Sequence, residues 1–258
     1  GTLLFRRVRS EGPWHPSCTK DGAMALRWLR AVLESAAAML FPDRCGACAE
    51  ECQGPLCDDC AETLVATPAG CPVCGAPADE ALLPVLRPRR CAHCRERAPP
   101  YAKARAPYLH GGALAEAIWR FKYDGCEELA RPLALLFEGC EAPRSQVIAP
   151  VPLHLSRLRE RGFDQAALLA RAAARRFALP CAHLLVRTRP TKAQVGLDRT
   201  RREANVRGAF RARRAVPGAR VCLVDDVLTT GATAAEAARA LLAAGAAHVE
   251  VRTLARAP

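Results

Sequence analysis

One segment, residues 221–236, restricts the fold of this chain more than any other part of the sequence. It reads V-C-L-V-D-D-V-L-T-T-G-A-T-A-A-E, in which four apolar residues precede two carboxylates and a loop of small residues. An unbroken apolar run of this length predicts a strand that is buried on both faces, as in a parallel sheet covered by helices. Ligands of such sheets bind beyond the C-terminal ends of the strands. Asp225 and Asp226 are therefore predicted to border a ligand site.

The loop after the two carboxylates is predicted to bind a phosphate group. Its glycine lets the backbone curl, and amides at the start of the next helix can converge on an anion. A T-x-x-E pattern from Thr233 to Glu236 predicts a capping box that starts this helix. The carboxylates repel a phosphate, so we expect them to accept hydrogen bonds from ribose hydroxyls, with Mg²⁺ nearby. The predicted phosphate-binding residues are Thr229, Thr230, Gly231, Ala232 and Thr233.

The sequence around this segment predicts an α/β domain over residues 99–258. Helical stretches alternate with short apolar runs there, which is typical of a parallel sheet flanked by helices. The clearest strands are expected at 146–151, 221–224 and 248–254, and helices at 113–123, 164–177 and 234–244. Pro99 and Pro100 mark the linker that precedes this domain.

The first 44 residues are expected to lie outside both folded modules. Residues 1–23 are polar and are predicted to be a disordered extension, which makes Met24 a candidate translation start. Residues 24–44 are predicted to form an amphipathic helix, ending before Pro42, and a linker. That helix carries charges and is too short to span a bilayer. No signal peptide is evident, so we expect a cytoplasmic protein without a membrane partner.

Cysteines define a second module at residues 45–98. Nine of the 14 cysteines lie there, and eight of them form four C-x-x-C pairs. In a reducing compartment this spacing indicates two structural Cys₄ zinc sites, whereas disulfides would require an oxidising one. The spacing allows sequential or interleaved pairing of the pairs, and Cys52 is expected to be a bystander. The predicted zinc ligands are Cys45, Cys48, Cys57, Cys60, Cys71, Cys74, Cys91 and Cys94.

The positive charge of the chain is concentrated in one region. The formal net charge is +12, and residues 151–220 hold 17 Lys and Arg against four Asp and Glu, or +13. An excess of this kind favours anionic partners such as phosphates, nucleotides or nucleic acid. Six arginines of this region match no predicted ligand loop and are candidates for binding DNA: Arg199, Arg201, Arg202, Arg211, Arg213 and Arg214.

The ordered motifs of the chain resemble those of one protein family. Residues 221–233 are similar to the phosphoribosyl pyrophosphate (PRPP) motif of type I phosphoribosyltransferases, and the chain from about residue 40 to 256 resembles the ComF/GntX family within that superfamily. The resemblance is carried by L-F-P-D-R-C-G-A-C, C-P-V-C-G-A-P, F-K-Y-D-G, V-P-L-H-L-S-R-L-R-E-R-G-F-D-Q and Q-V-G-L-D-R-T-R-R-E-A-N-V-R-G-A-F. It implies the type I phosphoribosyltransferase fold behind a double zinc ribbon. The family usually has Asn where this chain has Asp164, and both residues cap helices well.

The resemblance also implies roles for individual residues. Asp225 and Asp226 resemble the catalytic pair that contacts the ribose 2′- and 3′-hydroxyls, and residues 191–197 fall where a lid closes in the superfamily. The pyrophosphate end of PRPP is expected to contact Val151, Pro152, Leu153, His154, Arg157, Arg161 and Lys192. For three of these residues, a structural role without ligand contact stays open. His154 would then form hydrogen bonds within its loop, and Arg157 and Arg161 would belong to a solvated face. The role of Lys122 in F-K-Y-D-G is also open.

Two functions follow from the resemblance. The first is transfer of phosphoribose from PRPP to a nitrogen nucleophile through an oxocarbenium-like sugar, with release of pyrophosphate and with Mg²⁺ neutralising the leaving group. The second is non-catalytic: ComF-like proteins are linked to natural transformation, and the chain would sense PRPP or a nucleotide. In that case it would bind single-stranded DNA, or dock a competence helicase or recombination protein.

Overall fold

The computed structural model describes residues 44–77, 89–191 and 199–257. These residues belong to one compact unit, Asp43–Pro258. The predicted extension at 1–23, the helix at 24–41 and Lys192 lie outside the described residues. Since the cysteine module and the α/β domain fall within one compact unit, their boundary near residue 98 stays a prediction.

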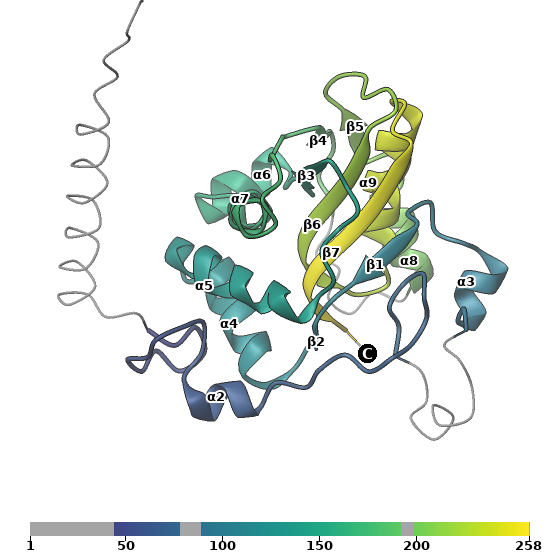
Figure 1. Cartoon of the computed structure of the whole chain (residues 1–258). Helices are drawn as coiled ribbons and strands as arrows, with labels where there is room; N and C mark the ends of the chain where they lie inside the picture. Colours follow the sequence, from purple (N-terminus) through teal and green to yellow (C-terminus); the bar gives the residue numbers. More distant parts are fainter. Residues whose placement is uncertain (1–43, 78–88, 192–198, 258) are drawn as a thin grey trace, which may run out of the picture. The chain divides into compact units, whose positions relative to one another are not determined.

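The helices and strands of the described part follow the alternation that the sequence predicts (Figure 1). The α-helices are α2 (Asp58–Glu62), α3 (Ala92–Glu96), α4 (Gly112–Tyr123), α5 (Ala130–Leu135), α6 (Leu155–Arg161), α7 (Gln165–Arg176), α8 (Arg199–Val206) and α9 (Ala232–Ala243). Two 3₁₀ turns, η2 (Glu127–Leu129) and η3 (Leu136–Gly139), flank α5. The strands are β1 (Lys103–Arg105), β2 (Tyr108–Leu109), β3 (Val147–Pro150), β4 (Leu185–Arg187), β5 (Phe210–Ala212), β6 (Arg220–Leu228) and β7 (His248–Arg256).

The main sheet is parallel throughout and has the order β1-β7-β6-β3, with β2 also paired to β7. Its register places Cys222 of β6 between Ile148 of β3 and Glu250 of β7. Strand β3 ends at Pro150, opposite Val224, while β6 stays paired with β7 as far as Leu228. The predicted parallel α/β fold is confirmed, and β6 runs four residues beyond its predicted end.

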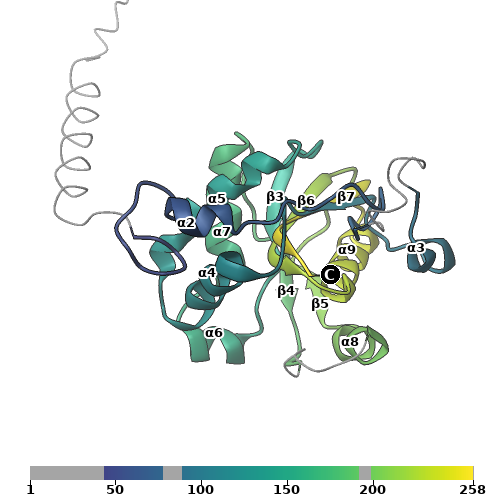
Figure 2. The same cartoon turned by 90° about the horizontal axis from the view of Figure 1, so that it is seen from below.

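Both faces of the sheet are covered, which explains the unbroken apolar run in β6. Cys222 and Val224 pack into a core with α4, α5 and α7, and Val221 and Leu223 pack into a second core with α9. Figure 2 shows the strands between these two groups of helices. Cys222 is fully buried, so it behaves as a small apolar side chain.

Two helix starts show where local rules hold and where they fail. Asp164 caps α7 as predicted, since its Oδ1 accepts a hydrogen bond from the Ala167 amide at 3.0 Å. The capping box predicted for α9 is wrong. That helix begins at Ala232 after Gly231 in the left-handed region, without a side-chain cap. Glu236 instead accepts a hydrogen bond from the Gly208 amide at 2.7 Å.

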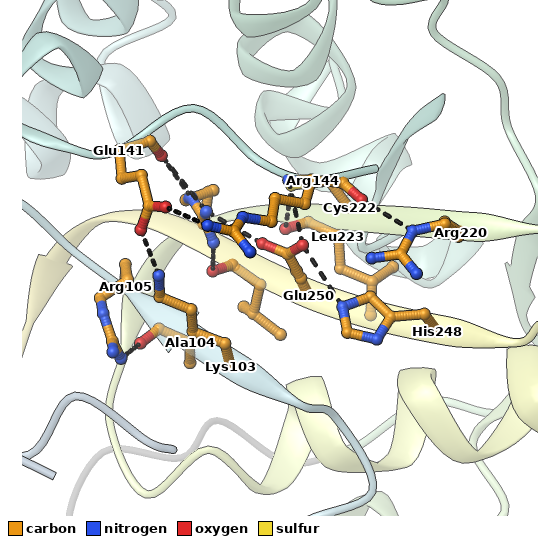
Figure 3. Close-up of polar contacts among 12 residues, drawn as sticks. Lys103, Ala104, Arg105, Glu141, Arg144, Arg220, Cys222, Leu223, His248 and Glu250 are labelled. Atoms are coloured by element: carbon orange, nitrogen blue, oxygen red, sulfur yellow. Dashed lines mark hydrogen bonds and ion pairs between the residues drawn. The ribbon is translucent and has the colours of Figure 1, made fainter. Parts of the chain in front are cut away.

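A charged cluster lies around the N-terminal parts of β6 and β7 (Figure 3). Its centre is Glu250, whose side chain lies 3.0 Å from Arg252 Nη2 and 3.3 Å from His248 Nε2. Glu250 also accepts a hydrogen bond from the Arg144 amide, so this buried charge is well satisfied. Lys103 and Glu141 form an ion pair at the edge of the cluster.

Candidate functional site

The eight cysteines predicted as zinc ligands form two clusters, Cys45/Cys48/Cys57/Cys60 and Cys71/Cys74/Cys91/Cys94. Within each cluster the sulfur atoms all lie within 4.8 Å of one another. The Cys48 and Cys57 sulfurs are 3.6 Å apart, and those of Cys74 and Cys91 are 3.7 Å apart. Four sulfurs at about 2.3 Å from a tetrahedral zinc ion would be about 3.8 Å apart, so both clusters fit structural zinc. Of the two pairings left open, the sequential one is confirmed.

The first cluster is attached to helix α4. Arg120 Nη1 donates to the carbonyl oxygens of Cys45 and Gly46, at 3.1 Å each. A Cβ atom on Gly46 would lie only 3.2 Å from the Ala117 side chain, so the turn between Cys45 and Cys48 packs closely on the helix. The same helix carries Lys122 and Tyr123, which line the cavity described next.

A cavity of about 390 Å³ opens at the C-terminal ends of the central strands. Asp225 and Asp226 of β6 line it, together with Thr229, Gly231 and Thr233 of the loop predicted to bind phosphate. Leu153, His154, Arg157 and Arg161 line it from the segment that follows β3. The structure therefore brings together two separate stretches of sequence, 153–161 and 225–233, that are predicted to contact one ligand.

Four of the predicted ligand residues that the structure describes do not line this cavity. Val151 and Pro152 are buried beside it. Thr230 and Ala232 line a smaller cavity on the opposite side of their loop. Within the loop, the Thr230 hydroxyl accepts a hydrogen bond from the Ala232 amide at 3.3 Å. These four residues shape the loops rather than face the main cavity.

The two carboxylates of β6 have different surroundings. Asp226 is 5% exposed, and its Oδ2 lies 2.9 Å from the Lys122 ammonium nitrogen. Asp225 is half-buried and accepts a hydrogen bond from the Asp226 amide at 2.9 Å. Burial and the neighbouring Asp226 carboxylate raise the pKa of Asp225 to about 7, against the opposing effects of Lys122 and Arg187. One carboxylate is thus held as an ion pair, and the other titrates near neutral pH.

The segment after β3 is held by side-chain caps at both of its helices. His154 caps α6, because its Nδ1 accepts from the Ser156 amide at 3.2 Å. Asp164, which caps α7, also accepts from the Leu153 amide at 3.4 Å. The Asp164 carboxylate is therefore occupied by backbone amides, and His154 acts as a loop hydrogen bonder.

The two arginines of α6 that line the cavity, Arg157 and Arg161, differ in their partners. Arg157 pairs with Glu160 at 2.8 Å on the same helix. The Arg161 guanidinium lies over the Tyr123 ring, 4.8 Å from its centroid, and its Nη2 is 3.3 Å from the Tyr123 hydroxyl. Its Nε and Nη1 are buried and have no hydrogen-bond partner among the described residues. Buried N–H groups of a cation favour an anionic ligand at this point of the cavity.

Several cavity residues carried no assignment in the sequence, or only an open one. Lys122 and Tyr123 come from α4, His110 from the segment before it, Arg187 from β4 and Arg202 from α8. Arg202 was assigned above to a DNA surface, and its position in the cavity corrects that assignment. Burial and the Lys122 charge lower the pKa of His110. The F-K-Y-D-G motif contains Lys122 and Tyr123, and the Q-V-G-L-D-R-T-R-R-E-A-N-V-R-G-A-F motif contains Arg202. His110 and Arg187 had no local signal, because only tertiary packing brings them to the cavity.

Comparison with known proteins gives consistent similarities. The phosphoribosyl transferase domain family matches residues 164–258. The chain is 34% identical to the DNA utilization protein YhgH of Escherichia coli over 212 residues, which cover 78% of this chain and 90% of that protein. It is 33% identical to Competence protein F of Haemophilus influenzae, over 66% of this chain and 79% of that protein. It is 32% identical to Competence protein ComFC of Bacillus subtilis, over 72% and 77% of the two chains.

A helix that crosses a bilayer must be both long and apolar. None of the described helices combines the length and the apolar character that a membrane-spanning segment needs.

Proposed function

Because this chain belongs to the ComF/GntX family of type I phosphoribosyltransferase-like proteins, we propose that its main cavity binds PRPP together with Mg²⁺. The observation that carries this proposal is the convergence of the 229–233 loop, the two carboxylates and Arg161 on one cavity. PRPP presents a phosphate, two ribose hydroxyls and a pyrophosphate, and each of these groups meets residues of suitable chemistry.

The 5-phosphate is assigned to the loop before α9. Gly231 lies in the left-handed region at φ 78°, which tightens the loop at the N-terminus of a 12-residue helix. The dipole at the N-terminus of this helix favours an anion there. Asp225 and Asp226 accept hydrogen bonds from the ribose hydroxyls, and the Lys122 ammonium nitrogen, 2.9 Å from Asp226 Oδ2, holds that carboxylate in place for this role.

The pyrophosphate is assigned to Arg161, Arg187 and Arg202, with the Leu153–His154 turn beside them. The Nε atoms of all three arginines are buried without a hydrogen-bond partner in the described part of the chain. Phosphate and carboxylate oxygens are suitable ligands for Mg²⁺, which would neutralise charge on the pyrophosphate when bound with PRPP.

We further propose that the chain transfers phosphoribose from PRPP to a nitrogen nucleophile. The bond from ribose C1 to pyrophosphate oxygen breaks, the bond from C1 to nitrogen forms, and pyrophosphate leaves with the electron pair. The chain's residues hold both ends of PRPP and screen the charge on the departing group. The names of the bacterial relatives place them in competence and DNA utilization, and we propose the same pathway for this protein.

The test is calorimetric titration with PRPP, with and without Mg²⁺. We expect binding that strengthens with Mg²⁺, and at least a tenfold loss when Asp225→Asn and Asp226→Asn are combined, because each charge-assisted hydrogen bond contributes on the order of 1.5–3 kcal/mol. The matched control is Asp58→Asn with Asp59→Asn, an exposed pair on α2. Equal PRPP affinity in both double variants would contradict the assignment.

The arginine assignment has its own control on the same helix. Arg161→Met should weaken binding of pyrophosphate, while Arg159→Met, at an exposed position of α6, should not. Release of pyrophosphate from PRPP in the presence of candidate nitrogen nucleophiles then tests transfer. If PRPP binds but no nucleophile releases pyrophosphate, the protein is a PRPP sensor.

A further inference from the structure

A second, smaller cavity lies behind the loop before α9. It has a volume of about 60 Å³, and Thr230, Gly231 and Ala232 form one of its walls. Cys74 and Cys94 of the second cysteine cluster line the same cavity, and Tyr101 and Arg256 lie with them. The rear of the loop therefore borders the second candidate metal centre.

Tyr101 contacts the loop at its glycine. Its side chain is buried, and its hydroxyl oxygen lies 2.8 Å from the position that a Cβ atom on Gly231 would occupy. No larger residue fits at Gly231 without a shift of Tyr101, and the left-handed φ of 78° independently favours glycine. The backbone at the start of α9 thus rests directly on the Tyr101 hydroxyl.

Arg256 fixes the direction of two peptide groups of the loop. Its Nη1 donates to the carbonyl oxygens of Leu228, at 2.8 Å, and of Thr229. These peptide bonds are trans, so each carbonyl points opposite to the N–H of the same peptide group. The amides of Thr229 and Thr230 are therefore directed away from Arg256. Because Arg256 is 5% exposed at the end of β7, this orientation is held from inside the fold.

The second cysteine cluster is built onto the strand that follows Tyr101. The Ala104 amide of β1 donates to the Val73 carbonyl oxygen at 2.7 Å. A Cβ atom on Gly75 would lie 3.0 Å from the Ala104 carbonyl oxygen, so the turn that contains Cys71 and Cys74 is in close contact with the strand. Loss of the turn between Cys71 and Gly75 would remove these contacts to β1. Both Tyr101, which precedes β1, and the cysteines that line the cavity would then lose support.

We propose that Tyr101 and Arg256 are positioning residues that shape the phosphate loop from behind, and that the second cysteine cluster acts on the loop through Tyr101. Metal occupancy of Cys71, Cys74, Cys91 and Cys94 then raises the affinity of the loop for a phosphate group. The inference rests on the proposed function, since it assigns the loop to the 5-phosphate. It makes this cluster part of the binding machinery, in contrast to the first cluster on α4.

The first experiment compares two probes, ribose 5-phosphate and pyrophosphate, titrated calorimetrically into the full chain. Arg256→Met should weaken ribose 5-phosphate at least tenfold and change pyrophosphate less than twofold, and Arg256→Lys should restore part of the loss. The matched control is Arg220→Met at the other end of the sheet, where Arg220 Nε donates to the Arg144 carbonyl oxygen at 2.9 Å (Figure 3). Tyr101→Phe, which keeps the ring, should show the same selective loss at smaller size.

The second experiment tests the metal connection with two equivalent cysteines. Cys57 and Cys91 each precede the short helix of their cluster, at the N-cap position of α2 and α3. Cys57→Ser and Cys91→Ser should each lower the bound zinc by about one ion per chain. Only Cys91→Ser should weaken ribose 5-phosphate, by at least fivefold.

The outcomes separate this inference from the proposed function. If the parent binds neither probe, the proposed function fails and the inference falls with it. If the parent binds both probes and Arg256→Met and Tyr101→Phe bind ribose 5-phosphate as tightly as the parent, only the inference is overturned. Equal losses for both probes, or for both cysteine variants, would indicate general damage to the fold and would also overturn it.

Discussion

The Lys122 ammonium nitrogen lies 2.9 Å from Oδ2 of Asp226, and this ion pair joins helix α4 to strand β6 at the wall of the main cavity. The Lys122 and Asp226 side chains are only 20% and 7% exposed. The first cysteine cluster also contacts this helix, since Arg120 donates to the carbonyl oxygens of Cys45 and Gly46.

We predict that Lys122→Met lowers the free energy of unfolding by about 2–3 kcal/mol at pH 7, somewhat less than for a fully buried pair. The substitution leaves the Asp226 carboxylate buried without its cation. The control is Lys103→Met, which removes the more exposed pair with Glu141 and should cost less than about 1 kcal/mol. Urea unfolding measures both, and equal values for the two variants would show that Asp226 does not depend on Lys122.

Asp225 provides a prediction about pH. Its pKa in the folded protein is about 7, raised from 3.8 by burial and by Asp226. The folded state therefore holds this proton more tightly than the unfolded state, and stability falls as pH rises from about 4 to about 7. Asp225→Asn carries no charge at any of these pH values. We predict that this variant is as stable as the parent near pH 4 and more stable by about 2–4 kcal/mol at pH 8.

Urea unfolding at intervals between pH 4 and pH 8 tests this behaviour. The exposed carboxylate Asp58 on α2 gives the matched control, since Asp58→Asn should not acquire the same pH dependence. If the free energies of unfolding of Asp225→Asn and the parent differ by the same amount at every pH, the pKa of the Asp225 carboxyl is not raised.

The two cysteine clusters predict metal content. We expect about two zinc ions per chain in protein purified without added metal, measured by elemental analysis. Strong chelation should remove both and lower the unfolding temperature, because a structural site stabilises the fold that contains it. Near-zero zinc together with a loss of free thiols would contradict the metal interpretation.

The central elements were predictable because their signals are local. The apolar run of β6 and the helical period of α7 lie within single segments, and Asp164 caps its own helix. The end of β6 was not predictable, since β7 keeps it paired beyond the carboxylates. The capping box at Thr233 failed for the same kind of reason: Glu236 is engaged by the Gly208 amide, which comes from a different segment.

The candidate site was predictable only where one motif supplies several ligands. Asp225, Asp226 and the loop that follows are contiguous, so their chemistry is visible in the sequence. Arg187 and Arg202 come from separate elements, and only the packing of β4 and α8 brings them to the same cavity. Arg256 acts through backbone carbonyls of another strand, for which no sequence pattern exists.

The last prediction concerns DNA. Arg211, Arg213 and Arg214 are exposed on and beyond β5, and none of them lines the main cavity. A basic surface of this kind binds phosphates without reading the bases, so we predict weak, sequence-independent binding of single-stranded DNA. The affinity should fall with salt at a log–log slope of about −0.7 for each phosphate neutralised. Few aromatic side chains are available for stacking, with 5% aromatic residues in the chain, so most of the affinity should be electrostatic.

The matched pair of variants removes the same charge from two different surfaces. Replacing Arg211, Arg213 and Arg214 by Ala should make the slope shallower by about 1–2 and leave PRPP affinity unchanged. Replacing Arg171, Arg175 and Arg176 of α7 by Ala, also exposed, should change the slope little. Equal changes in slope for the two triple variants would mean that DNA binding depends only on the net charge of the protein. If the parent binds no DNA at low salt, contact with DNA belongs to a partner, because counterion release is largest under those conditions.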